Sequence, residues 1–290
     1  MFGKDSESSK METGSEEWSR DVINRLAFAA VNEQRRTRRW NIFFKVLLAL
    51  YLLALLILYM PTDWDQLGKT SEKHTALVEL KGVISDKSEA SADTVIKGLR
   101  NAFEDENTAG VILRANSPGG SPVQSGYIYK EIKRLRELHP DTPLYAVVTD
   151  VCASGCYYVV SAADDIYVDE ASIIGSIGVR MDSFGFVETM EKLGVERRLY
   201  TAGESKGFLD PFTPAKSDEV EHVKLLLDSI HRQFITAVQQ GRGERLHEND
   251  KLFTGLVWTG EEGIPMGLAD EIGSSSYVAR DVIGVEEIVD

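Results

Sequence analysis

Residues 144–158, LYAVVTDVCASGCYY, join an apolar segment to a turn of small residues. The apolar part, Leu144–Thr149, is short and rich in β-branched residues, which predicts a buried strand. A second segment of this kind, Gly110–Ala115, runs into the sequence NSPGG at residues 116–120. Strands that end in such turns and lead into helical segments are typical of α/β folds. These two strand ends therefore decide the expected architecture.

The segments around these strands alternate in the same way. Two segments between the strands carry helical periodicity. In the second of them Ile128, Ile132, Leu135 and Leu138 form an apolar stripe. The alternation predicts one α/β domain in which helices cover parallel or mixed sheets. The expected strands are Ala76–Ile84, Gly110–Ala115, Leu144–Thr149 and Asp165–Val168, and the expected helices are Ser91–Phe103 and Ser125–Leu138.

A longer helix is expected nearer the C terminus. Thr213 is suited to cap it, Pro214 to occupy its first position and Gly241 to end it. The preceding segment, Val195–Tyr200, is strand-like. Between the limits of the helix, six apolar residues recur at helical spacing: Val220, Val223, Leu227, Ile230, Phe234 and Val238.

The composition indicates a folded protein. Apolar residues make up 43% and charged residues 27% of the 290 residues, and these fractions are ordinary for a globular chain. The formal net charge of −14 repels phosphate backbones and argues against a nucleic-acid partner. The two cysteines have neither the spacing nor the neighbours of a metal site, and no cofactor is expected.

The most apolar segment, Ile42–Met60, contains a single charged residue, Lys45, near its start. About 20 apolar residues are enough to span a hydrocarbon core of about 30 Å. The alternatives are a buried core helix or a cleaved signal peptide, but a signal peptide has a shorter apolar region and no polar leader of this length. Basic residues gather on the N-terminal side, which places the N terminus in the cytoplasm by the positive-inside rule.

The predicted organisation follows from this anchor. Residues 1–40 are expected to form a cytoplasmic tail and residues 41–60 a single transmembrane anchor in the inner membrane. Residues 61–73 are expected to be a linker, and residues 74–290 a periplasmic or otherwise extracytoplasmic domain. Within the tail, apolar residues at helical spacing predict a short amphipathic helix over Trp18–Val31, which could lie on the membrane surface or be solvated.

Ser154 stands at the start of a predicted helix, between Ala153 and Gly155. The turn would expose its hydroxyl, the helix N terminus would favour negative charge, and the Gly155 amide could serve as an oxyanion donor. The Gly-rich turn at residues 116–120 could present further N–H groups. On local chemistry alone, an ordinary helix N-cap is the favoured interpretation of Ser154, and the glycine turn could equally be a plain connection. The pattern is not G-x-S-x-G, so no hydrolase triad is indicated.

A lysine is a better candidate than a histidine to activate this serine. The five histidines lie before a strand, at a helix end, on the long helix and in a polar loop, and none is expected to act. Lys206 lies in the sequence TAGESKGFLDPF at residues 201–212. Burial without a carboxylate partner lowers the pKa of a lysine from about 10.4 and would let it accept the serine proton. On the local sequence alone, an exposed loop lysine beside Glu204 is the favoured interpretation of Lys206.

Two cysteines, Cys152 and Cys156, flank Ser154. They could pair in an oxidising compartment. Free cysteine is among the most buried residue types and packs as a small apolar side chain. The sequence favours this second interpretation, in which the two residues pack the turn without pairing.

Five ordered motifs make the chain similar to the signal peptide peptidase A family of serine–lysine peptidases. They are SPGG at 117–120, ASGCYY at 153–158, GSIGV at 175–179, the lysine loop at 201–212, and TGEE at 259–262 followed by GLAD at 267–270. The similarity covers roughly residues 76–273. Five motifs in the family's order are far more specific than any single one, and they favour the functional interpretation of each.

The resemblance implies a role for each site residue. Ser154 corresponds to the nucleophile, Lys206 to the general base, and Ser176 to a serine whose hydroxyl helps to hold the lysine amine. Gly155, and Gly120 or its neighbour Gly119, correspond to the residues whose backbone amides stabilise the oxyanion. The implied fold is that of caseinolytic protease and crotonase enzymes, in the short single-repeat form. That form implies a ring or dome in which neighbouring chains supply the serine and the lysine, so that a lone protomer is inactive.

Two features depart from the family pattern. Cys156 stands where the family more often has glycine, which suggests a tighter or redox-sensitive turn after the nucleophile. Pro265 breaks the late helix that precedes Gly267, which affects the expected length of that helix but not the chemistry.

The resemblance predicts a membrane-anchored serine endopeptidase that hydrolyses remnant signal peptides or other apolar peptides at the membrane. Its expected partners are these peptides, the membrane and further copies of the chain. One alternative is an acyl-CoA hydratase on the same fold, which would need acidic groups at the site and no anchor. The other is a non-catalytic membrane scaffold or adaptor that retains the fold, and the presence of both Ser154 and Lys206 argues against it.

Overall fold

The computed structural model describes residues 33–57 and 72–290 of the chain. The chain divides into two compact units, Met1–Lys69 and Thr70–Asp290. The expected amphipathic helix Trp18–Val31, the last three residues of the expected anchor and most of the expected linker lie outside the described residues.

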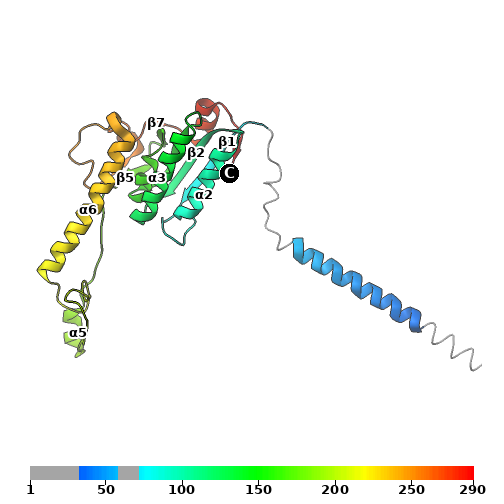
Figure 1. Cartoon of the computed structure of the whole chain (residues 1–290), viewed down its shortest axis with the longest axis horizontal. Coiled ribbons are helices and arrows are strands. Elements are labelled where there is room, and N and C mark those ends of the chain that lie inside the picture. Colours follow the sequence, from blue (N-terminus) through cyan, green and yellow to red (C-terminus); the bar gives the residue numbers. More distant parts are fainter. Residues whose placement is uncertain (1–32, 58–71) are drawn as a thin grey trace, which may run out of the picture. The chain divides into compact units, whose positions relative to one another are not determined.

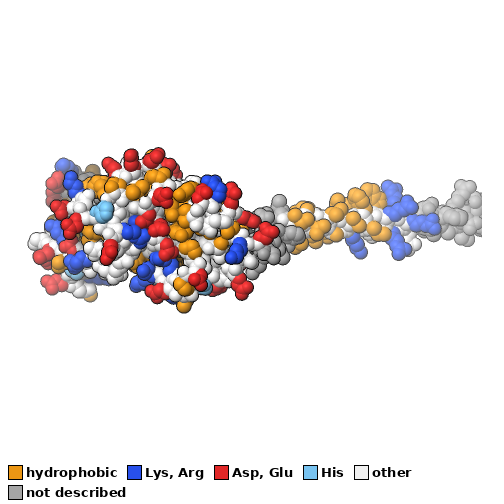
Figure 2. Space-filling view, turned by 90° about the horizontal axis from the view of Figure 1, so that it is seen from above, with side chains coloured by type: hydrophobic (Ala, Val, Ile, Leu, Met, Phe, Trp, Pro, Cys, Tyr) orange, Lys and Arg blue, Asp and Glu red, His pale blue; other side chains and the backbone are white. Residues whose placement is uncertain are grey.

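The described part of the first unit is one helix, Glu33–Ile57, whose most apolar window has a mean hydropathy of 2.2. At 1.5 Å per residue its 25 residues extend about 38 Å, so by length and composition it can cross a membrane. The side chains of this window are not buried within the chain. Figure 2 shows apolar side chains along the helix and basic side chains gathered toward one end. The helix begins ahead of the expected anchor because it includes the basic residues.

In residues 72–290, eight strands form one mixed sheet. Its main path runs β6-β5-β3-β2-β1-β8, while β4 pairs with β3 and with β7. All strand pairs are parallel except β5 with β6. The strands are β1 (His74–Lys81), β2 (Thr108–Ser117), β3 (Leu144–Ala153), β4 (Asp165–Val168), β5 (Ile173–Gly175), β6 (Val257–Thr259), β7 (Glu271–Ile272) and β8 (Ile288–Val289).

The sheet forks along β3. The first half of β3, at residues 145–147, pairs with β4, and its last residues, 151–153, pair with β5 instead. On its other side, β3 pairs with β2, where Ser117 is aligned with Cys152 after an irregularity in the register. The fork therefore brings the carboxyl ends of β2, β3 and β5 together, which is where active groups collect in parallel α/β sheets.

Both faces of the central strands are buried, as parallel strands require. Alternate residues of β1, β2 and β3 enter the main core, which the helices α2 (Ala92–Glu104) and α3 (Pro122–Leu138) cover. The residues between them, Leu77, Ile112 and Val147, face a smaller core with the helical segment η3 (Val278–Ile283). Figure 1 shows α2 and α3 side by side on the sheet. The expected mixed α/β architecture is therefore confirmed.

Residues beyond β5 form a projection that we call the arm, residues 179–230. It contains α5 (Val187–Leu193) and the first half of α6 (Ser217–Arg242), and Figure 1 shows α5 at the end of α6 that is remote from the sheet. No residue of α5 is buried, and the buried residues of α6 all lie in its last third. Apolar side chains of the arm are strongly exposed within the chain: Phe184 (74%), Leu193 (72%) and Tyr200 (90%).

The root of α6 packs on the helices beside the sheet. The rings of Phe234 and Tyr158 lie 5.0 Å apart, and the Tyr129 hydroxyl donates to the Ala237 carbonyl at 3.0 Å. Tyr158 belongs to α4 (Gly155–Val160), the short helix that follows Ser154. The root of the arm is thus joined directly to the helix that begins at the candidate nucleophile.

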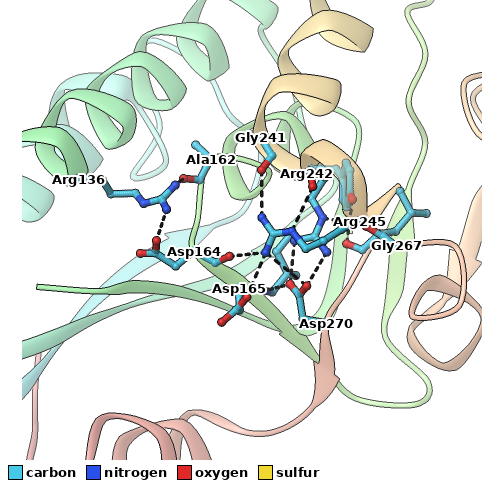
Figure 3. Close-up of polar contacts among 12 residues, drawn as sticks. Arg136, Ala162, Asp164, Asp165, Gly241, Arg242, Arg245, Gly267 and Asp270 are labelled. Carbon is cyan, nitrogen blue, oxygen red and sulfur yellow. Dashed lines mark hydrogen bonds and ion pairs between the residues drawn. The ribbon is translucent and has the colours of Figure 1, made fainter. Parts of the chain in front are cut away.

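A buried ion network holds the C-terminal end of α6 (Figure 3). Arg242, 1% exposed, donates to both oxygens of Asp270 at 2.7 and 2.8 Å and to the Gly267 carbonyl at 2.8 Å. Burial alone would raise the pKa of Asp270, but the hydrogen bonds and charge of Arg242 outweigh it and hold that pKa below its usual value. Arg245 extends the network to Asp165.

Two sequence predictions of local structure were wrong. Helix α6 begins at Ser217, with Lys216 as N-cap, and ends at Arg242 before Gly243, so neither Thr213 and Pro214 nor Gly241 mark its ends. Val195–Tyr200 forms no strand, because no neighbouring strand reaches the arm to pair with it. The late helix α7 comprises only Gly260–Gly263, so it ends ahead of Pro265, as the sequence indicated.

Candidate active site

Ser154 occupies a strained turn between β3 and α4. Its backbone angles are φ 52° and ψ −121°, a conformation that costs a non-glycine residue about 1–3 kcal/mol and persists only where the surroundings enforce it. Its amide donates to the Gly175 carbonyl at 2.9 Å. Its hydroxyl does not cap α4, although Ser154 holds the N-cap position. The plain N-cap interpretation is therefore wrong, and the turn resembles a nucleophile elbow although the G-x-S-x-G sequence is missing.

The glycine turn after β2 packs against this serine. A Cβ on Gly119 would lie 2.6 Å from the Ala153 carbonyl oxygen and the Gly155 nitrogen. Gly119 also has φ +93°, a conformation that side chains rarely adopt. Residues 119–121 are fixed from the other side by Ile84, whose amide donates to the Gly119 carbonyl at 2.9 Å and whose carbonyl accepts from the Ser121 amide at 2.8 Å.

These bonds also orient the Gly120 amide. Backbone groups of an extended segment point alternately to opposite sides. Because Gly119 and Ser121 bond to Ile84, the N–H of Gly120 points away from Ile84, toward the turn that carries the serine. A Cβ on Gly155 would lie 3.1 Å from the Gly120 nitrogen. In the described part of the chain, neither the Gly120 amide nor the Gly155 amide donates a hydrogen bond.

Ser176 joins the same group through β5. Gly175 is aligned with Ala153, so the residues that follow them, Ser176 and Ser154, leave neighbouring strand ends together. Ser176 also has a positive φ of 53°, and its amide donates to the Leu256 carbonyl at 2.7 Å. Five of the six predicted site residues are therefore gathered at one edge of the sheet: Ser154, Gly119, Gly120, Gly155 and Ser176.

Lys206, the sixth, lies on the arm. It belongs to the segment between α5 and α6, and its side chain is exposed within the chain. Its amide donates to the Gly203 carbonyl at 3.2 Å. In residues 33–57 and 72–290 its ammonium forms no salt bridge, whereas nearby Arg197 pairs with Asp210. The first half of α6 separates this segment from the sheet, so a single chain does not bring Lys206 to Ser154.

The cysteines differ from the favoured sequence interpretation. Cys152 and Cys156 form a disulfide, with their Cα atoms 5.1 Å apart, and both side chains are fully buried. The prediction that they pack the turn without pairing was wrong, because the turn at Ser154 folds the first residues of α4 back onto the end of β3. Their symmetric placement about Ser154 was the signal for this pairing.

Sequence reasoning missed two supporting residues. Ile84 fixes the glycine turn through its bridge with Gly120. The fully buried Ser125 places its hydroxyl where a side chain on Gly155 would lie, 2.5 Å from the added Cβ. Nothing in the local sequence of either residue indicates these contacts, since both depend on the pairing of distant segments.

The chain belongs to peptidase family S49, whose sequence model matches residues 136–283. This confirms the expected membership of the signal peptide peptidase A family, and the matched region contains Ser154, Ser176 and Lys206. Gly119 and Gly120 lie ahead of the matched region, so their assignment to the site depends on the contacts described above.

Relatives with curated names extend the comparison. The chain is 30% identical to the putative signal peptide peptidase SppA of Enterococcus faecium over 71% of this chain and 61% of that protein. It is 33% identical to protease 4 of Haemophilus influenzae over 69% of this chain and 32% of that protein. A Brucella abortus protein named Na(+)/H(+) antiporter NhaA is 45% identical over 64% of this chain but only 25% of its own length. The chain thus spans less than two thirds of the length of each of these relatives.

Proposed function

We propose that this chain is a serine endopeptidase anchored in a membrane, which uses Ser154 as nucleophile and Lys206 as general base. The observation that carries the proposal is the Ser154 turn. Ser154 adopts an enforced, strained conformation in a turn that packs against Gly119 and lies beside Gly120. Among the described residues, the amides of Gly120 and Gly155 donate no hydrogen bond and are available to an oxyanion. Membership of peptidase family S49 supports the same activity.

The chemistry follows from these groups. The Ser154 oxygen attacks a peptide carbonyl while Lys206 accepts its proton. The amides of Gly120 and Gly155 donate to the oxyanion that forms, an interaction worth about 3–4 kcal/mol per donor in related sites. The protonated lysine then gives its proton to the leaving amine. Water, deprotonated by the same lysine, hydrolyses the acyl-enzyme, while Ser176 helps to hold the lysine amine.

The lysine is supplied by a neighbouring copy. The part of α6 without buried residues that lies in the arm, residues 217–230, is about 21 Å long. A projection of this length supports delivery of Lys206 to another protomer. The exposed apolar residues of the arm need a partner surface, because contiguous apolar patches of this kind mark interfaces. A head-to-tail contact of this type forms a ring when the rotation between neighbouring chains brings the last copy back to the first, and we propose such a closed ring. In that ring each active site uses the serine of one chain and the lysine of the next.

Location and substrate complete the proposal. The helix Glu33–Ile57 spans the inner membrane once, with its arginines in the cytoplasm and the peptidase unit outside it. The substrates are remnant signal peptides or other apolar peptides at the membrane surface. The relative from Enterococcus faecium is named a putative signal peptide peptidase, which supports this substrate class.

The test uses the full-length protein in detergent micelles with an unstructured apolar peptide. Ser154→Ala and Lys206→Ala should each abolish hydrolysis, whereas Lys192→Ala, an exposed lysine of the arm, should not. Coexpression of the two inactive variants should restore activity at about a quarter of the sites, because one chain then supplies the serine and the next the lysine. Normal hydrolysis by either single variant would refute the dyad, and a non-catalytic scaffold would show no hydrolysis in the unaltered protein.

A further inference from the structure

The Cys152–Cys156 disulfide encloses the candidate nucleophile. It joins the residue two positions before Ser154 to the residue two positions after it. Cys152 lies in β3, where it is aligned with Ser117 of β2 and Ile174 of β5. Cys156 lies in the first turn of α4. The disulfide therefore ties the first turn of α4 to a strand held on both sides.

The backbone at Ser154 needs such a restraint. Its positive φ is an unfavourable conformation that must be enforced by the surroundings. The hydrogen bond from the Ser154 amide to Gly175 fixes the side of the turn that faces β5. The Gly119 turn fills the space beside it but forms no hydrogen bond to Ser154. On the α4 side, the Ser154 carbonyl accepts a hydrogen bond from the Tyr158 amide at 3.0 Å. The disulfide adds a covalent link between the two ends of the strained turn.

The size of the loop indicates a local effect. A disulfide stabilises a fold largely by restricting the unfolded chain, and this contribution grows with the length of the loop that it closes. Here the two cysteines are separated by only 4 positions, so the contribution to the stability of the whole domain is at the low end. The restraint acts on the geometry of the turn.

We propose that the Cys152–Cys156 disulfide is a positioning element for Ser154, and that breaking it lowers turnover without unfolding the domain. This inference rests on the proposed peptidase function. Cys152 and Cys156 act through Ser154 and do not contact substrate. Their loss lets the turn relax toward a more ordinary backbone conformation, which moves the hydroxyl relative to the amides of Gly120 and Gly155.

The covalent step is a thiol–disulfide exchange. The two thiols lose two protons and two electrons to a disulfide oxidant, such as an oxidised thiol–disulfide oxidoreductase, and the Sγ–Sγ bond forms. A dithiol reductant reverses the step by returning two electrons and two protons, and becomes a disulfide itself. Disulfides persist in extracytoplasmic compartments, which agrees with the proposed location of this unit.

The experiment compares the full-length protein with the double variant Cys152→Ala/Cys156→Ala in detergent micelles. The kcat of the variant should fall between about tenfold and about a hundredfold, because a displacement of about 1 Å in a catalytic group has an effect of this size. The KM should change much less, since the groups that bind the peptide remain. A purely structural role would instead lower the melting temperature and the amount of folded protein, with the kcat of the folded fraction unchanged.

A second measurement does not depend on catalysis. Hydrogen–deuterium exchange of the amides in residues 153–158 should accelerate in the double variant, while exchange in β1 and β2 stays unchanged. Reduction of the unaltered protein with dithiothreitol, followed by alkylation to count thiols, should reproduce both effects, and the same treatment of the variant should change nothing. Unchanged kcat or unchanged exchange in the variant would overturn the proposal. Normal hydrolysis by Ser154→Ala would instead refute the peptidase assignment, whatever the exchange data show.

Discussion

Arg242 and Asp270 form a two-pronged ion pair in which both terminal nitrogens of the guanidinium bond to the two carboxylate oxygens. The pair connects the last turn of α6 to the segment that precedes β7. The Arg242 side chain is fully inaccessible to solvent, and the Asp270 carboxylate is the group that compensates its charge. This buried pair therefore adds to the aromatic packing that attaches the arm to the domain.

Removing one member of this pair should be costly. Arg242→Ala leaves the Asp270 carboxylate without its main partner, and breaking a buried pair destabilises a protein by about 3–5 kcal/mol. Urea unfolding of the full-length protein in detergent micelles, followed by a signal from the unit at residues 72–290, would measure the loss. Arg280→Ala is the matched control, because Arg280 and Asp281 form an exposed pair worth less than about 1 kcal/mol. Equal unfolding midpoints for the two variants would contradict the expectation.

The acid stability of the domain should depend on Glu131. Hydrogen bonds from Arg134 and then Arg100 lower the pKa of Glu131 from 4.5 to about 2. Since the pKa in the folded state is depressed, this stabilisation is fully present above the unfolded pKa and is lost as the pH falls from about 4.5 to about 2. Both arginines are about half exposed, so solvent screening reduces the effect to about 1–2 kcal/mol.

Glu131→Gln tests this dependence. The variant should be less stable than the unaltered protein at neutral pH, and the difference should shrink as the pH is lowered toward 2. Thermal unfolding followed by circular dichroism across this pH range would measure it. A stability difference that stays constant with pH would contradict the linkage.

An alanine at Gly119 should disable the site with little effect on the rest of the domain. The added Cβ would collide with backbone atoms on both sides of Ser154, and the positive φ adds strain of about 1–3 kcal/mol. Peptide hydrolysis should fall by at least about a hundredfold. Gly126→Ala is the control, because its Cβ would meet only the Tyr158 hydroxyl at 3.9 Å and alanine favours a helix by about 1 kcal/mol. Full activity of the Gly119 variant would refute the placement of this turn.

A charge on the arm should prevent assembly without unfolding the chain. Tyr200 is 90% exposed, so Tyr200→Asp removes no intrachain packing but places a charge in the proposed interface. Light scattering in detergent should show smaller particles than for the unaltered protein. The control, Leu138→Asp, alters an exposed residue at the end of α3 (61%) and should leave the particle size unchanged. Identical sizes for all three proteins would argue against an interface at the arm.

The sequence predicted the centre of the fold better than its periphery. Strands β1 to β4 and helices α2 and α3 were located within a few residues, because their apolar spacing reflects burial on the sheet. The start of α6 was misplaced. Thr213 and Pro214 are good capping residues, but residues 213–216 are not helical in the structure. Local capping preference is a weak signal when no tertiary packing accompanies it.

The site was predicted in part for the same reason. Ser154, Gly155 and Ser176 follow strands, so their position in the sequence already places them at the sheet edge. The bridge between Ile84 and Gly120, and the irregular register that brings Ser117 beside Cys152, depend on strand pairing across long stretches of chain. No local pattern encodes such pairing, so these contacts could not be predicted from the sequence.

A small tilt of α6 where it packs on the domain displaces the other end of the helix by a larger amount. Helix α6 contacts the rest of the domain from its middle onward. His231 makes the first contact, with a ring nitrogen 3.0 Å from the Ile177 carbonyl oxygen, and the buried residues of the last third follow. Residues 217–230 are about 21 Å long, so a tilt of about 5° at His231 displaces the N-terminal end of α6 by about 2 Å. The rigidity of the packing around the last third of α6 therefore determines how precisely the lysine loop is positioned. A mutation that loosens this packing would produce a small tilt there and a larger displacement at the lysine loop.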